Sequence, residues 1–409
     1  MRHKPLNKSF ASLAWLIICG SALLAQTPRV FLLNAQVLQE RKARIFDPKV
    51  PPAVLKPALA KLESEAKKAL KTEIVSLVTK QATPPSGDKH DYMSQAPYFW
   101  RNPNTPDGFP YIRRDGERNP EIKQFPDHDL LDKMVVTVEQ LSLAYYFTNK
   151  EEYAARATEI LRLWFLDTKT KMNPNLQFAQ AIPGQNTGRG IGIIESRGLT
   201  RVVDSVGLLA GAKSWTKAEQ AGLEAWFSQY LNWLLESKNG RDESAAKNNH
   251  GTLYDVQAVS FALFIGKTDF AKQTLENVTK KRVAQQIEAD GRQPLELERT
   301  KSWNYSTMNL EGFVALAELG ENVGLDLWNF QTQDGRGIRP AIEFLYPFLS
   351  PANKWKYEQI EGWEPERLFP LMRRAARKYR DEKFHKMMMT VPPLEASDKT
   401  NLLGFQHTK

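Results

Sequence analysis

The chain has 409 residues, of which 42% are hydrophobic, and a formal net charge of +9, with Cys19 as its only cysteine. This hydrophobic content is enough for a sizeable core, and one cysteine excludes disulfide bonds within the chain. The positive charge suits an anionic partner or simple solubility, but no run of Lys and Arg and no nucleic-acid motif is present, so we predict no nucleic-acid partner.

The first 25 residues are predicted to be a signal peptide. MRHKPLNK is a basic start, FASLAWLIICGSALL (10–24) is apolar, and small residues allow cleavage after Ala25. The apolar run is too short for a membrane span, so the mature chain is expected to have none and to be periplasmic or secreted. The alternative is an uncleaved N-terminal anchor. Cleavage would also remove Cys19 and lower the net charge by three to +6, because residues 1–25 contain Arg2, Lys4 and Lys8 and no acid.

Helical periodicity dominates residues 26–409, which we predict to form one domain with a short C-terminal tail at 389–409. A helix is expected over 56–80, and helical hairpins are expected around 144–157 and 262–273, with looser versions at 208–223 and 315–328. Thr216 and Glu219 form a capping-box pattern before an apolar stripe on one helix face. Stacked hairpins indicate an all-α fold, either an α/α toroid or a solenoid, and their unequal spacing favours a toroid of about six or seven hairpins.

Three segments interrupt the helical pattern. Residues 82–126 are rich in Pro, Gly, Asp, Asn and aromatic residues, residues 182–198 read IPGQNTGRGIGIIESRG, and residues 350–365 form an irregular link. Long irregular segments inside a compact domain are often functional. We therefore expect the first two to contribute to a site.

Two polar clusters stand next to helical runs. KNNHGTLYDVQ (247–257) places Asn248, Asn249 and His250 where a helix is expected to begin, and RQPLELERTKSWNYSTMNLEG (292–312) places Arg299 six residues before Tyr305. No histidine after residue 25 has the spacing of a metal pair, and no nucleotide fingerprint is convincing, so neither a metal nor a cofactor is predicted.

These clusters, together with HDYMSQAPY and YIRRDGERNPE in the first irregular segment, resemble the alginate lyase family of polysaccharide lyases over residues 50–380. The resemblance implies an incomplete α/α toroid and β-elimination at a uronate. It implies that Asn249, His250, Arg299 and Tyr305 are the catalytic residues, and that the partner is an anionic polysaccharide.

The chemistry explains why such residues are needed. β-Elimination removes the proton at C5 beside the uronate carboxylate, so that carboxylate must be neutralised, and Asn249 and Arg299 suit this role. Tyr305 could act as both base and acid if Arg299 and His250 favour its phenolate, or His250 could be the base of an anti elimination. We expect a 1,4-linked polyuronate, alginate first, to be cut to 4,5-unsaturated ends. Glucuronan is the alternative, since its uronate has the mannuronate arrangement at C4 and C5.

A further group of polar and aromatic residues is predicted to bind substrate. Trp303 would stack on a sugar, and the full set is Asn248, Tyr254, Trp303, Tyr92, His90, Arg189, Arg197 and Tyr111. For several of these a purely structural role is the alternative. The aromatic residues of 82–126 would only anchor their loop, Arg189 and Arg197 would pair with Glu195, and Arg299 would pair with Glu296 or Glu298.

Two other functional classes remain open from the residues alone. A glycoside hydrolase would need facing carboxylates, for which Asp91, Glu195 and Asp255 are available. A non-catalytic protein that binds acidic glycans would keep the basic cleft and the aromatic residues without using Tyr305. The sequence does not determine the oligomeric state.

Overall fold

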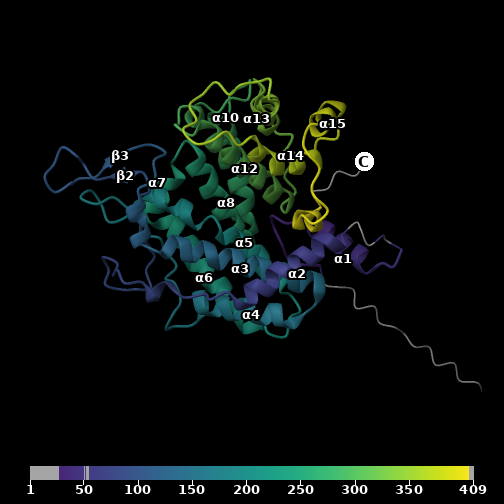
Figure 1. Cartoon of the computed structure of the whole chain (residues 1–409), viewed down its shortest axis with the longest axis horizontal. Helices are drawn as coiled ribbons and strands as arrows, with labels where there is room; N and C mark the ends of the chain where they lie inside the picture. Colours follow the sequence, from purple (N-terminus) through teal and green to yellow (C-terminus); the bar gives the residue numbers. More distant parts are fainter. Residues whose placement is uncertain (1–26, 50, 52–54, 405–409) are drawn as a thin grey trace, which may run out of the picture.

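The computed structural model describes residues 27–49, 51 and 55–404, so the predicted signal peptide lies outside the described residues. Helices dominate, and they gather around the centre of the molecule (Figure 1). The α-helices are α1 (Ala35–Phe46), α2 (Lys56–Lys71), α3 (Asp127–Thr148), α4 (Glu151–Leu161), α5 (Leu199–Leu208), α6 (Lys217–Glu236), α7 (Lys238–Ser244), α8 (Asn249–Phe264), α9 (Thr268–Gln273), α10 (Lys280–Gln286), α11 (Pro294–Leu297), α12 (Ser302–Glu321), α13 (Ile338–Leu345), α14 (Phe369–Ala376) and α15 (Glu382–Met388).

Four short strands form two small sheets outside the helical body. β1 (Met93–Gln95) pairs in parallel with β4 (Phe178–Ala181), and β2 (Phe99–Trp100) pairs antiparallel with β3 (Ile112–Arg113). The β2–β3 ribbon projects from the left side of the view in Figure 1. The irregular segment 82–126, called the arm from here on, and the irregular segment 182–198 therefore lie beside the helices.

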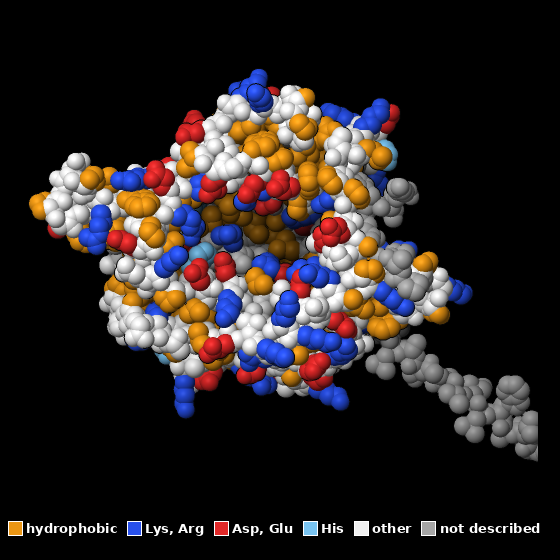
Figure 2. Space-filling view, in the orientation of Figure 1, with side chains coloured by type: hydrophobic (Ala, Val, Ile, Leu, Met, Phe, Trp, Pro, Cys, Tyr) orange, Lys and Arg blue, Asp and Glu red, His pale blue; other side chains and the backbone are white. Residues whose placement is uncertain are grey.

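The helical hairpins expected around 144–157, 208–223 and 262–273 are present, and the all-α toroid prediction is confirmed. The looser hairpin expected over 315–328 is absent, because the chain is irregular between the end of α12 at Glu321 and the start of α13 at Ile338. α3 and α4 are joined at Asn149, whose left-handed backbone (φ 56°) ends α3. α8 and α9 are joined by a similarly tight turn, and α5 leads into α6 through the capping box of Thr216 and Glu219. The face seen in Figure 1 is hollowed at its centre, as Figure 2 shows.

α8 is the central helix. Every residue of α8 except His250 is buried, and α8 packs against α12, α5 and α6. A helix that is apolar nearly all round belongs in the core. The first residues of α8 are polar because they lie at the open end of the helical core. This position explains why a polar cluster precedes the apolar part of the helix.

Two expectations for the chain outside the site need correction. The helix predicted over 56–80 ends at Lys71, because the backbone at Thr72 is extended and Ser76 caps a separate short turn at Leu77–Thr79. The described part of the tail predicted over 389–409 packs on the body, with Val391 and Leu402 buried and its last turn against α1 and α2. Within the described residues, no helix has the length and apolarity needed to cross a membrane.

Candidate active site

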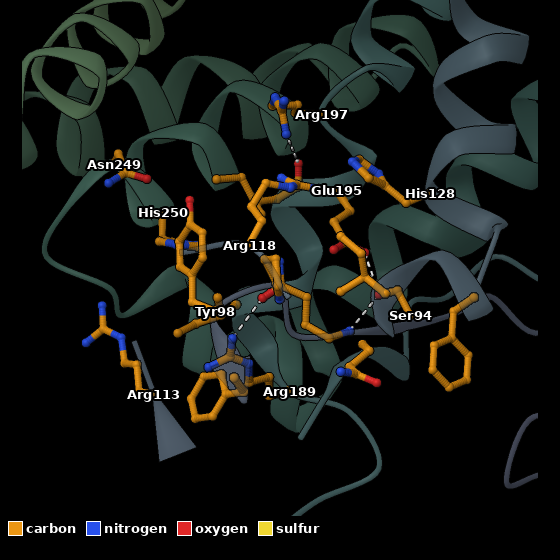
Figure 3. Close-up of a pocket in the computed structure, with 18 of the residues that line it drawn as sticks. Ser94, Tyr98, Arg113, Arg118, His128, Arg189, Glu195, Arg197, Asn249 and His250 are labelled. Atoms are coloured by element: carbon orange, nitrogen blue, oxygen red, sulfur yellow. Dashed lines mark hydrogen bonds between the residues drawn. The ribbon is translucent and has the colours of Figure 1, made fainter. Parts of the chain in front are cut away.

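A cavity of about 680 Å³ opens where the arm, the segment 180–197 and the first residues of α8 and α12 meet. The cavity is lined by Asn248, which precedes α8, and by Asn249 and His250 of the first turn of α8. It is also lined by Arg299, which precedes α12, and by Tyr305 of the first turn of α12. α8 and α12 pack side by side, which brings together two clusters about fifty residues apart in the sequence. Figure 3 shows Asn249, His250, Arg113, Arg118, Arg189 and Arg197 among the residues that line the cavity.

Asn249 is fixed by a buried carboxylate. Its backbone N–H donates to Oε1 of Glu296 at 2.6 Å and its Nδ2 donates to Oε2 at 2.7 Å. Burial raises the pKa of Glu296, although the bonds from Asn249 oppose that shift. Oδ1 of Asn249 is buried without a hydrogen-bond partner in the described chain, and the second Nδ2 hydrogen remains available to a ligand.

His250 is oriented by a second buried carboxylate. Its Nδ1 lies 2.7 Å from Oε1 of Glu243, on α7. A carboxylate accepts hydrogen bonds, so this contact favours the tautomer with the proton on Nδ1. Nε2, which is bonded to no described residue, is then left with a lone pair beside the cavity.

Arg299 does not pair with Glu296 or Glu298, the nearby acids that the sequence suggested as partners. Its Nε and Nη2 donate to Asp115 of the arm at 3.0 and 2.6 Å, and its guanidinium carbon lies 3.8 Å from the ring centroid of Tyr305. Although burial alone would raise the pKa of Asp115, the contacts with Arg299 hold it well below its usual range. The arm is therefore tied to the guanidinium that stacks on Tyr305.

The hydroxyl of Tyr305 donates to the hydroxyl of Tyr98 on the arm at 2.9 Å. Burial raises the pKa of Tyr305 well above its ordinary value, Tyr98 raises it further, and the opposing effect of Arg299 is smaller. Arg299 favours the phenolate, as expected, but burial and Tyr98 outweigh it. Tyr305 is therefore expected to keep its proton at neutral pH.

The cavity is strongly cationic. Its lining contains two carboxylates, Asp129 and Glu195, against the six cations Arg113, Arg118, Lys123, Arg189, Arg197 and Arg299. Neither Arg189 nor Arg197 pairs with Glu195: Arg189 donates to the side chain of Gln180 at 2.8 Å, and Arg197 donates to the carbonyl of Ile194 at 3.1 Å. Burial, and next the charge of Arg113, lower the pKa of Arg189 to about 10. Such a lining favours an anionic ligand.

Two aromatic residues predicted to bind substrate lie in the core instead. The ring of Trp303 is fully buried against Trp355 and Trp363, and its Nε1 donates to a backbone carbonyl. Tyr254 is buried on α8 and donates to the carbonyl of Leu234 at 2.8 Å. Neither presents a ring face to the cavity, because each lies on the inner side of its helix.

The three residues predicted from the segment 82–126 support the loop rather than line the cavity. Tyr92 is buried and donates to Glu195 at 2.7 Å. Nδ1 of His90 lies 2.6 Å from the carbonyl of Lys171. Tyr111 donates to Glu121 at 2.6 Å. These contacts agree with the alternative that the residues anchor their loop. Tyr98 and Phe99 of the same segment do line the cavity.

Several residues at the cavity were not predicted as site residues, although Asp115, Arg118 and Glu296 lie in segments singled out in the sequence. Glu243, Glu296 and Asp115 each hold one of the predicted catalytic residues, and Arg118 lines the cavity from the arm. Single acidic residues in helical or turn segments look like ordinary surface charges. Only the packing of α7, α11 and the arm against α8 and α12 shows their role.

The carboxylates considered for hydrolysis are not assembled as a pair. Asp255 is buried in an ion pair with Arg282, and Asp91 accepts hydrogen bonds from Asn173 and Asn175. Of the three carboxylates only Glu195 lines the cavity, and it already accepts from Tyr92 and Ser94. In the part of the chain that the structure describes, no group of three potential metal-ligating side chains occurs.

Comparison with known proteins gives concordant results. A family model described as alginate lyase matches residues 76–355. The crystal structure of an alginate lyase from Bacteroides ovatus has a TM-score of 0.87 and 38% identity, covering 92% of this chain and 99% of that chain. Alginate lyase A1-III from Sphingomonas species A1 has a TM-score of 0.53 and 18% identity, covering 86% and 96%.

A substituted form of alginate lyase A1-III in complex with a tetrasaccharide has a TM-score of 0.58 and 15% identity, covering 94% of this chain and 98% of that chain. At these identities the A1-III structures show a shared fold alone. No curated protein matches this chain.

Proposed function

This chain belongs to the alginate lyase family and is a polysaccharide lyase, and on that premise we propose that it cleaves a 1,4-linked polyuronate, alginate first, by β-elimination. The observation that carries the proposal is the cationic cavity that both Tyr305 and a carboxylate-oriented His250 line. In the reaction the C5–H and C4–O4 bonds break and a C4–C5 double bond forms. The C5 proton passes to a base, and O4 receives a proton.

We assign the two proton transfers to different residues. Nε2 of His250 has an open lone pair in the tautomer that Glu243 favours, which suits a base for the C5 proton. Tyr305 has a raised pKa, so it holds its proton at neutral pH and suits the acid that protonates O4. The alternative, in which Tyr305 performs both steps, requires it to ionise against its burial.

The uronate carboxylate would be neutralised at the first turn of α8. Asn249 can donate its second Nδ2 hydrogen there, and the N-terminus of a sixteen-residue helix favours an anion. Arg299 is already bonded to Asp115 and stacked on Tyr305. Its proposed role is therefore to position Tyr305, and the other cavity arginines would attract the remaining carboxylates of the chain.

The substrate is assigned to alginate on the family, and its finer identity rests on stereochemistry. Mannuronate and glucuronate share their arrangement at C4 and C5 and differ at C2. In both sugars H5 and O4 lie on the same face, so His250 and Tyr305 would have to act from that one face, and glucuronan is the second candidate. Guluronate, whose H5 and O4 lie on opposite faces, would need the anti route with His250 as the base. The protein is proposed to act after export, because its first 25 residues have the pattern of a signal peptide.

The deciding experiment follows absorbance of the unsaturated uronate on polymannuronate, polyguluronate, glucuronan and hyaluronan. An increase in absorbance with one polymer supports elimination and identifies the uronate that is cleaved. Release of reducing ends without absorbance would contradict elimination. Tyr305→Phe should lower turnover by about 10² to 10⁴ fold while substrate binding is retained.

His250→Gln separates the two proton-transfer schemes. If His250 is the base, this variant loses turnover as severely as Tyr305→Phe. If Tyr305 performs both steps, His250→Gln retains most of the turnover, which would refute the assignment of two residues. A conservative control is Tyr153→Phe, because Tyr153 is buried on α4, does not line the cavity, and its hydroxyl has no hydrogen-bond partner within the described residues.

A further inference from the structure

A second cavity, of about 750 Å³, lies between α1, α14 and α15. It shares no lining residue with the cavity that contains Tyr305. In Figure 1 these helices lie on the right of the molecule, on the side away from the β2–β3 arm. Any ligand there would be bound apart from the proposed chemistry.

Arg41 is the unusual residue of this cavity. It lies one turn after Leu38 on the inner face of α1, and only 9% of it is exposed. It forms neither a hydrogen bond nor an ion pair within the described part of the chain. Burial lowers the pKa of Arg41 and Arg44 lowers it further, while the adjacent Glu40 offsets only part of this. None of the nitrogens of Arg41 is among the fully buried atoms that lack a hydrogen-bond partner, so the guanidinium reaches the solvent of the cavity, where an anion can pair with it.

Four other cations line this cavity, and two of them pair with carboxylates. The lining also contains Arg373, Arg377, Lys378 and Arg380. Lys378 pairs with Glu321 at 2.7 Å, and Arg377 lies 3.6 Å from Glu318, but Arg373 donates to the carbonyl of Pro392 and Arg380 to that of Arg377.

The two acids of the lining are already engaged. Asp381 accepts from Arg339 at 2.7 Å and caps α15, and Glu40 accepts from the side chain of Gln36 at 2.9 Å. Three of the arginines, Arg41, Arg373 and Arg380, therefore face the cavity without a carboxylate partner. The lining has five Lys or Arg residues against these two acids, which gives it a net positive charge.

We propose that this cavity is a second, non-catalytic binding site for the uronate carboxylates of the polysaccharide. Guanidinium groups bind carboxylates through paired hydrogen bonds, and Asn34, Gln36 and Tyr379 add polar side chains that suit sugar hydroxyls. The ligand class rests on the proposed function, since it takes the substrate to be a polyuronate. Binding the polymer at a second place would raise its effective concentration at the cleft.

The test uses the full chain carrying Tyr305→Phe, so that a size-defined oligouronate is bound and not cut. Titration calorimetry should give two sites per chain. Adding Arg41→Gln should weaken the second site by about tenfold or more and leave the first unchanged. Lys386→Gln, an exposed cation on α15 outside the lining, is the matched charge control and should keep both sites.

Arg380→Gln repeats the test at an exposed position in case Arg41→Gln fails to fold. One site in the parent, or two sites that neither substitution affects, would overturn the inference. A titration with inorganic sulfate distinguishes the source of the anion. If sulfate occupies the second site and the oligouronate does not, the assignment to uronate is refuted.

Activity provides an independent readout with Tyr305 intact. Arg41→Gln should raise KM for long polymer several-fold and leave turnover of a short oligosaccharide unchanged. If the unsubstituted protein forms no unsaturated ends from any polyuronate, the proposed function fails. If it forms them but binds at one site only, this inference alone fails.

Discussion

Tyr305 is positioned by Arg299, six residues before it, and by two residues of the arm, Tyr98 and Asp115. Arg299 stacks on its ring, Tyr98 accepts its hydroxyl hydrogen, and Asp115 neutralises Arg299. Arg299 lowers the pKa of Tyr305 whereas the nearby charge of Asp115 raises it. Burial and Tyr98 set the raised pKa of Tyr305, and the charges of Arg299 and Asp115 adjust it in opposite directions.

This balance predicts the effect of Asp115→Asn. Removing the negative charge lowers the pKa of Tyr305, because Arg299 then acts without an opposing carboxylate. If protonated Tyr305 is the acid, the loss of activity on the alkaline side of the pH–rate profile moves to lower pH. Measurement of kcat/KM against pH checks this.

Asp107→Asn, on the same arm but bonded to the backbone of Phe109, is the matched control and should not shift the profile. An Asp115→Asn variant that gains activity on the acidic side would instead mean that Tyr305 acts as its phenolate.

At the scale of elements, the arm reaches the site through one close backbone approach. Gly116 has a φ of +78°, and a Cβ there would lie 2.6 Å from Oγ1 of Thr300 and 2.8 Å from Cδ1 of Ile360. Thr300 in turn donates to the backbone carbonyl of Asp115. Glycine is required there because the arm packs directly against the segment that carries Arg299.

Gly116→Ala is expected to displace the arm and separate Asp115 from Arg299. We predict a loss of kcat/KM of about tenfold or more, since misplacement of a positioning contact by about 1 Å has large effects on turnover. The helical circular-dichroism signal should not change. Gly87→Ala controls for backbone strain, because Gly87 also has a positive φ of +81° but nothing within 4 Å of its Cβ position. Equal losses in both variants would contradict the role of the close approach.

A second element-scale contact joins the first described residues to α5. Asp204 is buried and accepts the backbone N–H groups of Phe31, Leu32 and Leu33 at 2.7 to 3.0 Å. Burial raises the pKa of Asp204 to about 7, and the three hydrogen bonds only partly oppose this. The carboxyl is therefore expected to titrate near neutral pH in the folded protein.

The sign of the resulting pH dependence follows from linkage. Between about pH 4 and pH 7 the folded state binds a proton that the unfolded state releases, so the free energy of unfolding falls as pH rises through this range. Asp204→Asn should remove that slope and cost about 1 to 3 kcal/mol through a lost acceptor. Denaturant titrations at several pH values check this. Asp269→Asn, at an exposed position, should retain the slope; a parent protein with no slope would contradict the assignment.

At the scale of the whole molecule, charge is concentrated where the arm meets the helices. Six cations and two carboxylates line the cavity that contains Tyr305, and the carboxylates of the substrate would complement this excess of positive charge. Exposed pairs of charges are screened by salt, and the screening length falls from about 10 Å at 0.1 M to about 3 Å at 1 M.

We therefore predict that kcat/KM on a long polyuronate falls as salt rises over this range, mainly through KM. Arg197→Gln should lower kcat/KM at low salt and flatten its salt dependence, because Arg197 lines the cavity without a carboxylate partner. Lys386→Gln, outside the cavity, should leave the dependence unchanged. A salt-independent KM in the unsubstituted protein would refute electrostatic attraction of the polymer.

The sequence by itself determined the fold class and the family. Apolar residues at helical spacing require helices that bury one face, and tight polar turns between the helices produce hairpins. The toroid was therefore predictable from the sequence. The clusters at 247–257 and 292–312 were also predictable as parts of a site. Several polar residues beside a buried helix cost free energy unless they have partners or a ligand. The structure brings Asn249, His250, Arg299 and Tyr305 together as that reading requires.

Only the tertiary structure decided which partner each of these residues has and which aromatic residues face the cavity. Trp303 and Tyr305 are two positions apart on α12, and this places one ring in the core and the other in the cavity. Asp115, Glu243 and Glu296 come from elements separated in sequence, so no local pattern marks them. The pKa of Tyr305 rises because packing removes water from its hydroxyl, and burial of that kind exists only once the chain is folded.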